Sequence, residues 1–213
     1  MFSLHDFLAI LAAERPVFHS EADFQHAFAW LLHRKHPHLA IRLEVPVRVG
    51  QSVLHVDLLA SAGDKTIAIE LKYKTRALTF AAPGEAFQLT NQAAQDLARY
   101  DFIKDIQRIE QLAAARRGTS GYAIMLTNDS SYWTQARASD SVDAAFRLHP
   151  ERTLSGALAW HSRASAGTIR GREIALAING SYAVAWRDYS HIDSPRYGVF
   201  KYLAVEVKGD REN

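Results

Sequence analysis

Hydrophobic residues recur with the two-residue period of a β-strand along two neighbouring runs of the chain, at 55–62 and 65–72. The runs flank Gly63-Asp64, a dipeptide that favours a two-residue hairpin turn. Counting outward from this turn, the sequence predicts antiparallel pairing in which Asp57 faces Glu70. The predicted hairpin therefore brings two carboxylate side chains together, which makes it the first candidate for a functional site.

The predicted register gives this hairpin one apolar face and one face that contains charged residues. We expect the apolar face to carry the pairs Ala60/Ile67, Leu58/Ile69, Val56/Leu71 and Leu54/Tyr73. The second face carries Ser61/Thr66, Leu59/Ala68, Asp57/Glu70 and His55/Lys72. Two carboxylates directly opposite each other repel, so a positive group belongs between them. Lys72 is one candidate, and a hard divalent cation such as Mg²⁺ is another.

The remaining periodicity predicts an α/β protein with one strand before the hairpin and a long helix after it. Helices are expected at 3–14, 20–35 and 85–116. Strands are expected at 41–49, 121–126, 173–178, 181–187 and 199–207. Asn179-Gly180 predicts a hairpin turn between the strands at 173–178 and 181–187. The strand at 121–126 is almost wholly apolar, which is typical of a central strand covered on both faces.

Composition narrows the class of protein without naming a substrate. The 213 residues are 48% hydrophobic and carry a net charge of +2, so we expect a single domain spanning 1–213 rather than a disordered chain or a polyanion trap. No cysteine is present, which excludes disulfides and thiolate chemistry and is typical of a reducing cytoplasm. No apolar stretch is long enough for a membrane span, and the N-terminus lacks the basic start of a signal peptide. We expect a cytoplasmic protein.

Glu21 lies in the first turn of the predicted helix that Ser20 caps, at the edge of its apolar stripe. A carboxylate at this position stabilises the helix dipole and needs no other role. Its placement beside the buried stripe also makes it a candidate for a site on the sheet. Both interpretations remain open from the sequence.

An aspartate, twelve intervening residues and then Glu70-Leu71-Lys72, placed after a helix and before a long helix, resemble the PD-(D/E)XK nuclease superfamily. The likeness extends to small uncharacterised bacterial members. It implies a restriction-endonuclease-like α-β-β-β-α-β core over about 20–126, with a mixed sheet flanked by helices. The segment 127–213 would then add a C-terminal β-hairpin and strand. Val56 takes the place of the proline that often precedes the aspartate in this superfamily.

The resemblance implies a metal-dependent nuclease that hydrolyses phosphodiester bonds, of DNA rather than RNA, with a metal-activated water. Asp57, Glu70, the backbone carbonyl of Leu71 and Glu21 would hold Mg²⁺ or Mn²⁺, and Lys72 would position the attacking water. Nucleic-acid contacts are expected from Lys74, Arg76, Tyr100 and Lys104. The resemblance leaves open whether the protein acts as a homodimer.

Two other interpretations fit the same residues. The chain is alternatively a non-catalytic module that keeps the nuclease fold and binds nucleic acid or another protein. In the simplest interpretation, Asp57, Glu70, Lys72 and Lys74 form a solvated, ion-paired face of the sheet. This last interpretation predicts that Glu70 is exposed to solvent.

Overall fold

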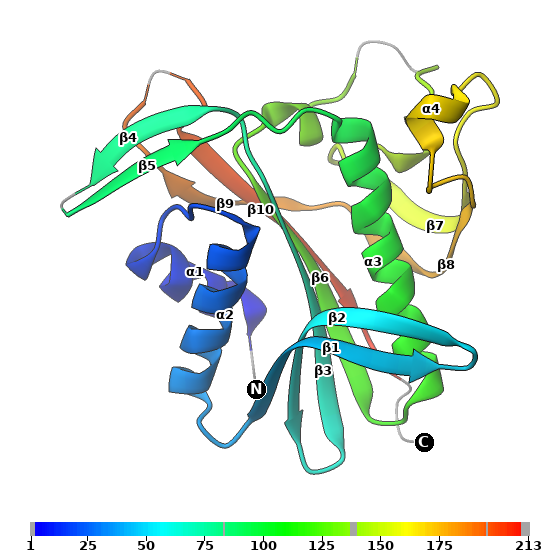
Figure 1. The fold of residues 1–213 in the computed structure, drawn as a ribbon, viewed down its shortest axis with the longest axis horizontal. Helices are drawn as coiled ribbons and strands as arrows, with labels where there is room; N and C mark the ends of the chain where they lie inside the picture. The colour runs from blue at the N-terminus through cyan, green and yellow to red at the C-terminus, as the bar shows by residue number, and fades with distance from the viewer. Residues whose placement is uncertain (1–2, 83, 137–139, 195, 210–213) are drawn as a thin grey trace.

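The computed structural model describes residues 3–82, 84–136, 140–194 and 196–209, and over these residues the chain is α/β with a mixed six-stranded sheet (Figure 1). The sheet contains β1 (Ala40–Val49), β2 (Ser52–Ala62), β3 (Lys65–Lys74), β6 (Thr119–Thr127), β10 (Val199–Val207) and β9 (Trp186–His191), in that spatial order. Strands β3 and β6 run parallel, whereas the other neighbours in the sheet are antiparallel. None of the described helices is both long enough and apolar enough to cross a membrane.

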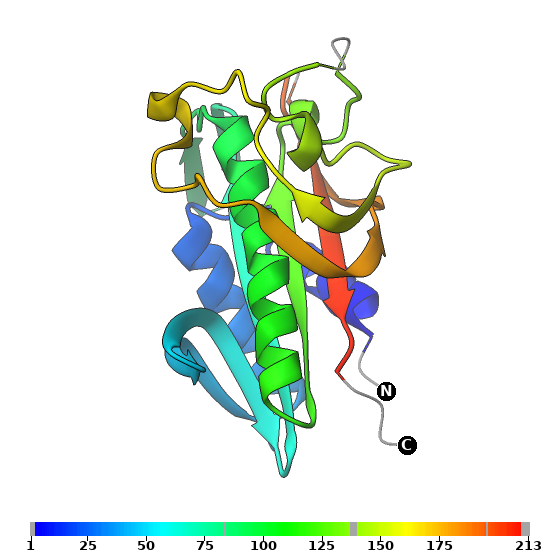
Figure 2. The same ribbon diagram turned by 90° about the vertical axis from the view of Figure 1, so that its right-hand side faces the viewer.

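Helices cover both faces of this sheet (Figures 1 and 2). On one face lie α1 (Leu4–Glu14) and α2 (Glu21–Lys35), whose apolar stripes pack with Leu58, Ile69 and Leu71. On the other face lie α3 (Gln95–Ala115) and the small sheet of β7 (Thr153–Leu158) and β8 (Leu176–Ala183). Successive residues of β6 alternate between the two cores, which confirms that this strand is covered on both faces.

The first part of the chain follows the hydrophobic pattern closely. Ser3 and Ser20 cap α1 and α2 through their side chains, and both helices end where the pattern predicts. The turn at Gly63-Asp64 connects β2 to β3, and the predicted register holds from Ala62/Lys65 to Leu58/Ile69. The final strand also has its predicted bounds.

The long helix begins ten residues later than predicted. Residues 85–89 instead belong to a β-hairpin of β4 (Leu78–Ala82) and β5 (Glu85–Leu89), and the predicted chain break at Pro83 lies outside the described residues. Phe80 and Phe87 pair across this hairpin with their rings stacked 4.7 Å apart between centroids. This cross-strand aromatic pair explains why the segment is extended, since such pairs stabilise a hairpin more than helix propensity favours the alternative.

The hairpin predicted at Asn179-Gly180 is also wrong, because β8 runs through both residues and pairs with β7. The pairing shifts register between Leu154 and Gly156, which leaves a bulge in β8. The Glu110 carboxylate of α3 accepts hydrogen bonds from the backbone N–H of Asn179 at 3.0 Å and of Gly180 at 2.7 Å. A side chain from a distant helix therefore satisfies the donors that a turn would have used. The remaining irregular region holds η1 (Ser130–Tyr132), η2 (Ala144–Phe146) and α4 (Ala166–Ile169).

Gly118 connects α3 to β6 against the turn of the β2–β3 hairpin. Its φ is +73°, and a Cβ atom there would lie 2.4 Å from the backbone oxygen of Asp64. Gly63 has a similar φ of +59° but has open space around the corresponding position. Only Gly118 thus combines a left-handed backbone with a steric limit set by another segment.

We expect Gly118→Ala to lower the free energy of unfolding by about 2–5 kcal/mol, because it adds overpacking to left-handed strain. Gly63→Ala is the matched control, and strain alone predicts a loss of about 1–2 kcal/mol. Urea denaturation followed by circular dichroism measures both. Equal losses in the two variants would contradict the close approach of this connection to the hairpin.

Candidate active site

The candidate site lies where β2 separates from β3. Their ladder ends at Leu58/Ile69, so the predicted pairs Val56/Leu71, His55/Lys72, Leu54/Tyr73 and Asp57/Glu70 do not form. The ladder between β1 and β2 continues to Val49/Ser52, and these two strands bend away together beside α3 (Figures 1 and 2). Val47 and Val56 pack there against Leu112 of α3, which favours the bend over continued pairing.

The separation leaves one edge of β3 without a neighbouring strand, and two carboxylates take its place. The Asp57 carboxylate accepts a hydrogen bond from the backbone N–H of Leu71 at 2.7 Å. The Glu21 carboxylate, from the first turn of α2, accepts one from Tyr73 at 2.8 Å. In a strand the N–H and C=O of one residue point to the same edge, so the Leu71 carbonyl also faces this edge. The Lys72 ammonium approaches that carbonyl at 3.5 Å.

Gln25 of α2 connects the bend to the helix. Its side-chain amide donates to the backbone oxygen of Asp57 at 2.8 Å and to the Glu44 carboxylate at 2.9 Å. Glu44 has a φ of +51°, which is rare for a residue with a side chain and marks the point where β1 changes direction. Gln25 therefore fixes the position from which Asp57 reaches β3.

Glu70 is buried at the centre of this arrangement, with 1% of its surface exposed. Among the residues that the structure describes, none donates a hydrogen bond of suitable geometry to either carboxylate oxygen, although Arg108 Nη2 lies 3.2 Å from Oε1. Burial, reinforced by the charges of Asp105 and Asp57, raises the pKa of Glu70 to about 9. The interpretation as a solvated sheet face is wrong, because that interpretation requires an exposed Glu70.

Two cations from β3 and α3 face these acids. The Lys72 ammonium lies 3.0 Å from the buried Asp105 carboxylate, and Arg108 contacts Asp105 at 3.1 Å. Burial alone would lower the pKa of Lys72, but Asp105, Glu21 and Asp57 together raise it above its ordinary value. Lys72 is therefore held as a cation. Burial raises the pKa of Asp57 despite its hydrogen bond from Leu71.

The carboxylates predicted as metal ligands are brought to one region, but they do not converge on one point. Within the described ranges, no three His, Cys, Asp or Glu side chains form a ready metal cage. Glu21 instead binds the backbone of β3 and lies 3.4 Å from the Lys74 ammonium. Asp57, Glu70 and the Leu71 carbonyl remain as hard oxygen donors at the separation of β2 from β3, which is a donor set suited to Mg²⁺.

The residues expected to contact nucleic acid are divided by the fold. Lys74 is the last residue of β3, Arg76 follows two residues later, and Lys104 is exposed on α3. Tyr100 is in the core instead, stacked 5.8 Å from Trp160 between ring centroids, and its hydroxyl donates to the backbone oxygen of Ile174. The apolar stripe of α3 buries this ring, so the prediction that Tyr100 lies on a nucleic-acid surface is wrong.

Sequence reasoning gave no role in the site to four polar residues that surround the carboxylates: Gln25, Glu44, Asp105 and Arg108. Asp105 had a signal, because it lies in the apolar stripe formed by Ala98, Phe102, Ile109 and Leu112. An acid in such a stripe calls for a buried partner. Gln25 follows Glu21 by one helical turn and shares its face. Glu44 carried no comparable signal.

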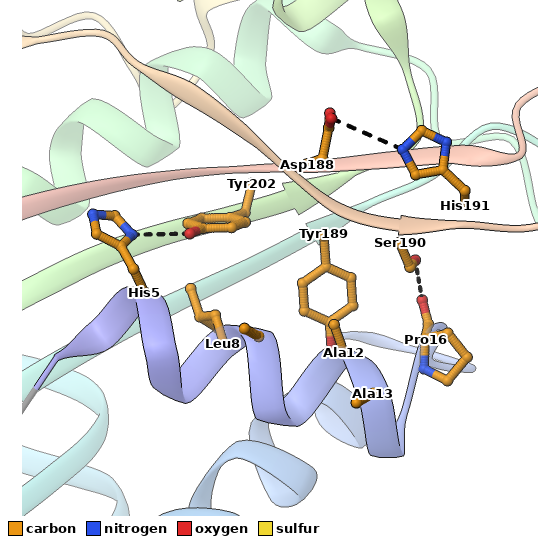
Figure 3. Close-up of a pocket in the computed structure, with 11 residues that line it drawn as sticks. His5, Leu8, Ala12, Ala13, Pro16, Asp188, Tyr189, Ser190, His191 and Tyr202 are labelled. Carbon is orange, nitrogen blue, oxygen red and sulfur yellow. Dashed lines mark hydrogen bonds and ion pairs between the residues drawn. The ribbon is translucent and has the colours of Figure 1, made fainter.

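A pocket of about 420 Å³ lies elsewhere, between α1 and the edge strand β9 (Figure 3). His5 is hydrogen bonded to the Tyr202 hydroxyl at 2.9 Å, and the Ser190 hydroxyl donates to the backbone oxygen of Pro16. Asp188 pairs with Lys201 and approaches His191. The contacts of His5 and Pro16 attach α1 and the residues after it to β10 and β9, whereas the contacts of Asp188 lie within β9 and between β9 and β10. None of the carboxylates at the β2–β3 separation lines this pocket.

We expect Glu70→Gln to stabilise the metal-free protein at pH 8 by about 1–4 kcal/mol, because the folded wild type must hold Glu70 protonated, or bury its charge, at a pH where the unfolded chain leaves it ionised. Protonation of Glu70 contributes stability that is fully present below its unfolded pKa of 4.5 and is lost as the pH rises through about 9. The advantage of the variant should therefore grow between these two values. Urea denaturation in EDTA across this range measures it, and a difference that does not depend on pH would contradict the raised pKa.

Comparison of the chain with family models, with curated proteins and with solved structures finds no match in any of the three.

Proposed function

We propose that the protein is a metal-dependent nuclease that hydrolyses phosphodiester bonds of nucleic acid, DNA rather than RNA. The observation that carries this proposal is the buried Glu70 carboxylate, which lacks well-aligned donors and lies near Asp57 where β2 leaves β3. A buried carboxylate without donors is costly unless a cation binds it. The order of α2, three antiparallel strands, α3 and a strand parallel to β3 supports a PD-(D/E)XK core.

The local charge supports a bound cation. Asp57, Glu70 and Asp105 carry three negative charges when ionised, against the two positive charges of Lys72 and Arg108. Asp57, Glu70 and the Leu71 carbonyl are the residues that would hold Mg²⁺ or Mn²⁺, since these cations take one or two carboxylates and keep several waters. When bound, the cation would stabilise charge on the scissile phosphate and lower the pKa of a water.

The protein's own groups provide the positioning. Asp57 and Glu21 hold the free edge of β3 through Leu71 and Tyr73, so the donor atoms at that edge are fixed by backbone hydrogen bonds. Asp105 holds the Lys72 ammonium, and the surrounding acids keep it protonated. Lys72 therefore acts as a cationic hydrogen-bond donor toward water or phosphate and not as a general base.

Cleavage is the direct test of this function. In Mg²⁺ or Mn²⁺, we expect the protein to cleave single-stranded, duplex or branched DNA, and Glu70→Ala and Lys72→Ala to lower the rate by at least about 100-fold. Lys65→Ala, at an exposed position at the other end of β3, is the matched lysine control and should change the rate by less than about threefold. Gel assays with end-labelled substrates measure these rates. Equal activity in the wild type and in both site variants would exclude the proposed centre.

Metal binding tests the site independently of cleavage. Calorimetric titration with Mn²⁺ should show one site in the wild type, and binding should be at least about tenfold weaker in Asp57→Asn and Glu70→Gln. Because binding to the folded state shifts the unfolding equilibrium, Mn²⁺ should raise the melting temperature of the wild type more than that of either variant. Absence of Mn²⁺ binding by the folded wild type would favour the non-catalytic module.

A further inference from the structure

A second polar pocket, of about 540 Å³, lies beyond the carboxyl ends of the parallel strands β3 and β6. Arg76 follows β3, and the loop after β6 contributes Asp129, Ser130, Ser131 and Thr134. Arg196 and Tyr197, from the segment before β10, complete the lining. In open α/β sheets, ligands bind in the crevice outside the carboxyl ends of parallel strands, and this pocket occupies that place.

The chemistry of this pocket suits an anion. Arg76 and Arg196 place their guanidinium groups 5.5 and 5.7 Å from the centre of the Tyr197 ring. The buried Asp129 carboxylate already accepts hydrogen bonds from Gln95 and from the backbone N–H of Ser131, and it lies 3.6 Å from Arg76 Nε. The pocket lining thus holds two guanidinium groups and one carboxylate, and the protein already supplies hydrogen bonds to that carboxylate, so the pocket is net positive.

Two polar atoms at this pocket lack a hydrogen bond within the described part of the chain, although one of them, Arg76 Nε, is within ion-pair distance of Asp129. Arg76 Nε and Ser131 Oγ are buried there without a hydrogen bond. Among the described residues, the guanidinium group of Arg196 contacts the ring of Tyr197. Buried donors without partners are costly, and a phosphate oxygen accepts hydrogen bonds from both guanidinium and hydroxyl groups.

The pocket is also held in place by its surroundings. The buried Asn128 side chain accepts a hydrogen bond from the backbone N–H of Arg76 at 2.7 Å and donates to the backbone oxygen of Tyr197 at 2.9 Å. Tyr197 has a φ of +60°, a strained conformation that such fixed contacts maintain. Asn128 therefore ties the segment after β3 to the segment before β10.

We infer that this pocket binds a backbone phosphate of the nucleic-acid strand whose scissile phosphate lies at Glu70 and Lys72. The inference rests on the proposed function and adds a phosphate site to it. Lys72, Lys74 and Arg76 occupy alternate positions of one segment, so Arg76 lies at most about 13 Å along the backbone from Lys72. At a rise of about 3.4 Å per nucleotide, this span corresponds to roughly four nucleotides. A single strand can therefore reach both places.

Binding of a fluorescent twelve-nucleotide single-stranded DNA, measured by anisotropy in EDTA, tests the pocket without requiring cleavage. Arg196→Gln should weaken binding by about tenfold. It should also reduce the slope of log affinity against log salt concentration by about 0.7, the value expected for one lost phosphate contact. Arg117→Gln, which removes an exposed charge just beyond the far end of α3, is the matched control and should change neither quantity.

The outcomes separate this inference from the nuclease proposal. Weaker binding by Arg196→Gln supports the pocket even if no variant cleaves DNA in Mg²⁺, a result that would refute the nuclease alone. Identical binding by Arg196→Gln and Arg117→Gln overturns the pocket even if the wild type cleaves. Failure of the wild type to bind the oligonucleotide also overturns it. If the Arg196 Nε–Hε resonance shifts with inorganic phosphate but not with the oligonucleotide, the pocket binds free phosphate and not a nucleic-acid strand, which also overturns the inference.

Arg76→Gln provides a second measurement at the same pocket. This variant also removes the contact with Asp129 and the hydrogen bond to Asn91, so its melting temperature is recorded beside its affinity. A tenfold loss of affinity in a variant that remains folded at the assay temperature supports the assignment. Unchanged affinity in the folded variant overturns the role of Arg76.

Discussion

Beyond Ile69, one edge of β3 has no neighbouring strand, so its backbone N–H groups need other hydrogen-bond acceptors. The architecture of the candidate site depends on this requirement. A buried strand edge cannot leave its donors unpaired at acceptable cost. Beyond Ile69, the donors of Leu71 and Tyr73 are bound by the carboxylates of Asp57 and Glu21. These two acids thus replace a strand, and they reach the edge from β2 and α2, which lie beside it.

This substitution explains why acidic residues gather at the point where β2 turns away. The bend is supported on one side by Gln25, which binds both Asp57 and Glu44, and on the other by apolar packing of Val47 and Val56 against Leu112. Continued pairing of β2 with β3 would fill the edge with backbone and leave no oxygen donors there. The bend instead leaves the Leu71 carbonyl and two carboxylates at the same edge.

The sequence was sufficient for features that depend on local periodicity and short connections. The capped helices α1 and α2, the Gly63-Asp64 turn and the register down to Leu58/Ile69 follow from such patterns. It was insufficient where a distant partner decides: Glu110 converts Asn179-Gly180 from a turn into a bulge, and Phe80 keeps Phe87 in a strand. The loss of pairing at Asp57 belongs to the same class, because it depends on Gln25 and Leu112. Asp57, Glu70 and Lys72 were predicted from hairpin register and spacing, whereas the contact that holds Lys72 against Asp105 required knowledge of how α3 packs.

The network around Glu70 is poorly explained as a structural device alone. Well-packed apolar side chains usually stabilise a core as much as a buried ion pair does, or more. A network retained for stability should at least give each carboxylate its donors and balance its charges. Asp57 has a backbone donor. Asp105 has two cations, although its Oδ2 lacks a well-aligned hydrogen bond, whereas Glu70 has one cation at 3.2 Å and, within the described residues, no well-aligned hydrogen bond at either oxygen. The carboxylate with the fewest donors is therefore that of Glu70, which directly precedes Leu71 at the start of the unpaired edge of β3. Protonation, which the raised pKa of Glu70 allows near neutral pH, removes the charge but leaves the carboxyl group without a hydrogen-bond partner among the described residues. A cation bound between the Glu70 carboxylate and the Leu71 carbonyl would balance the charge and supply the missing contact at once.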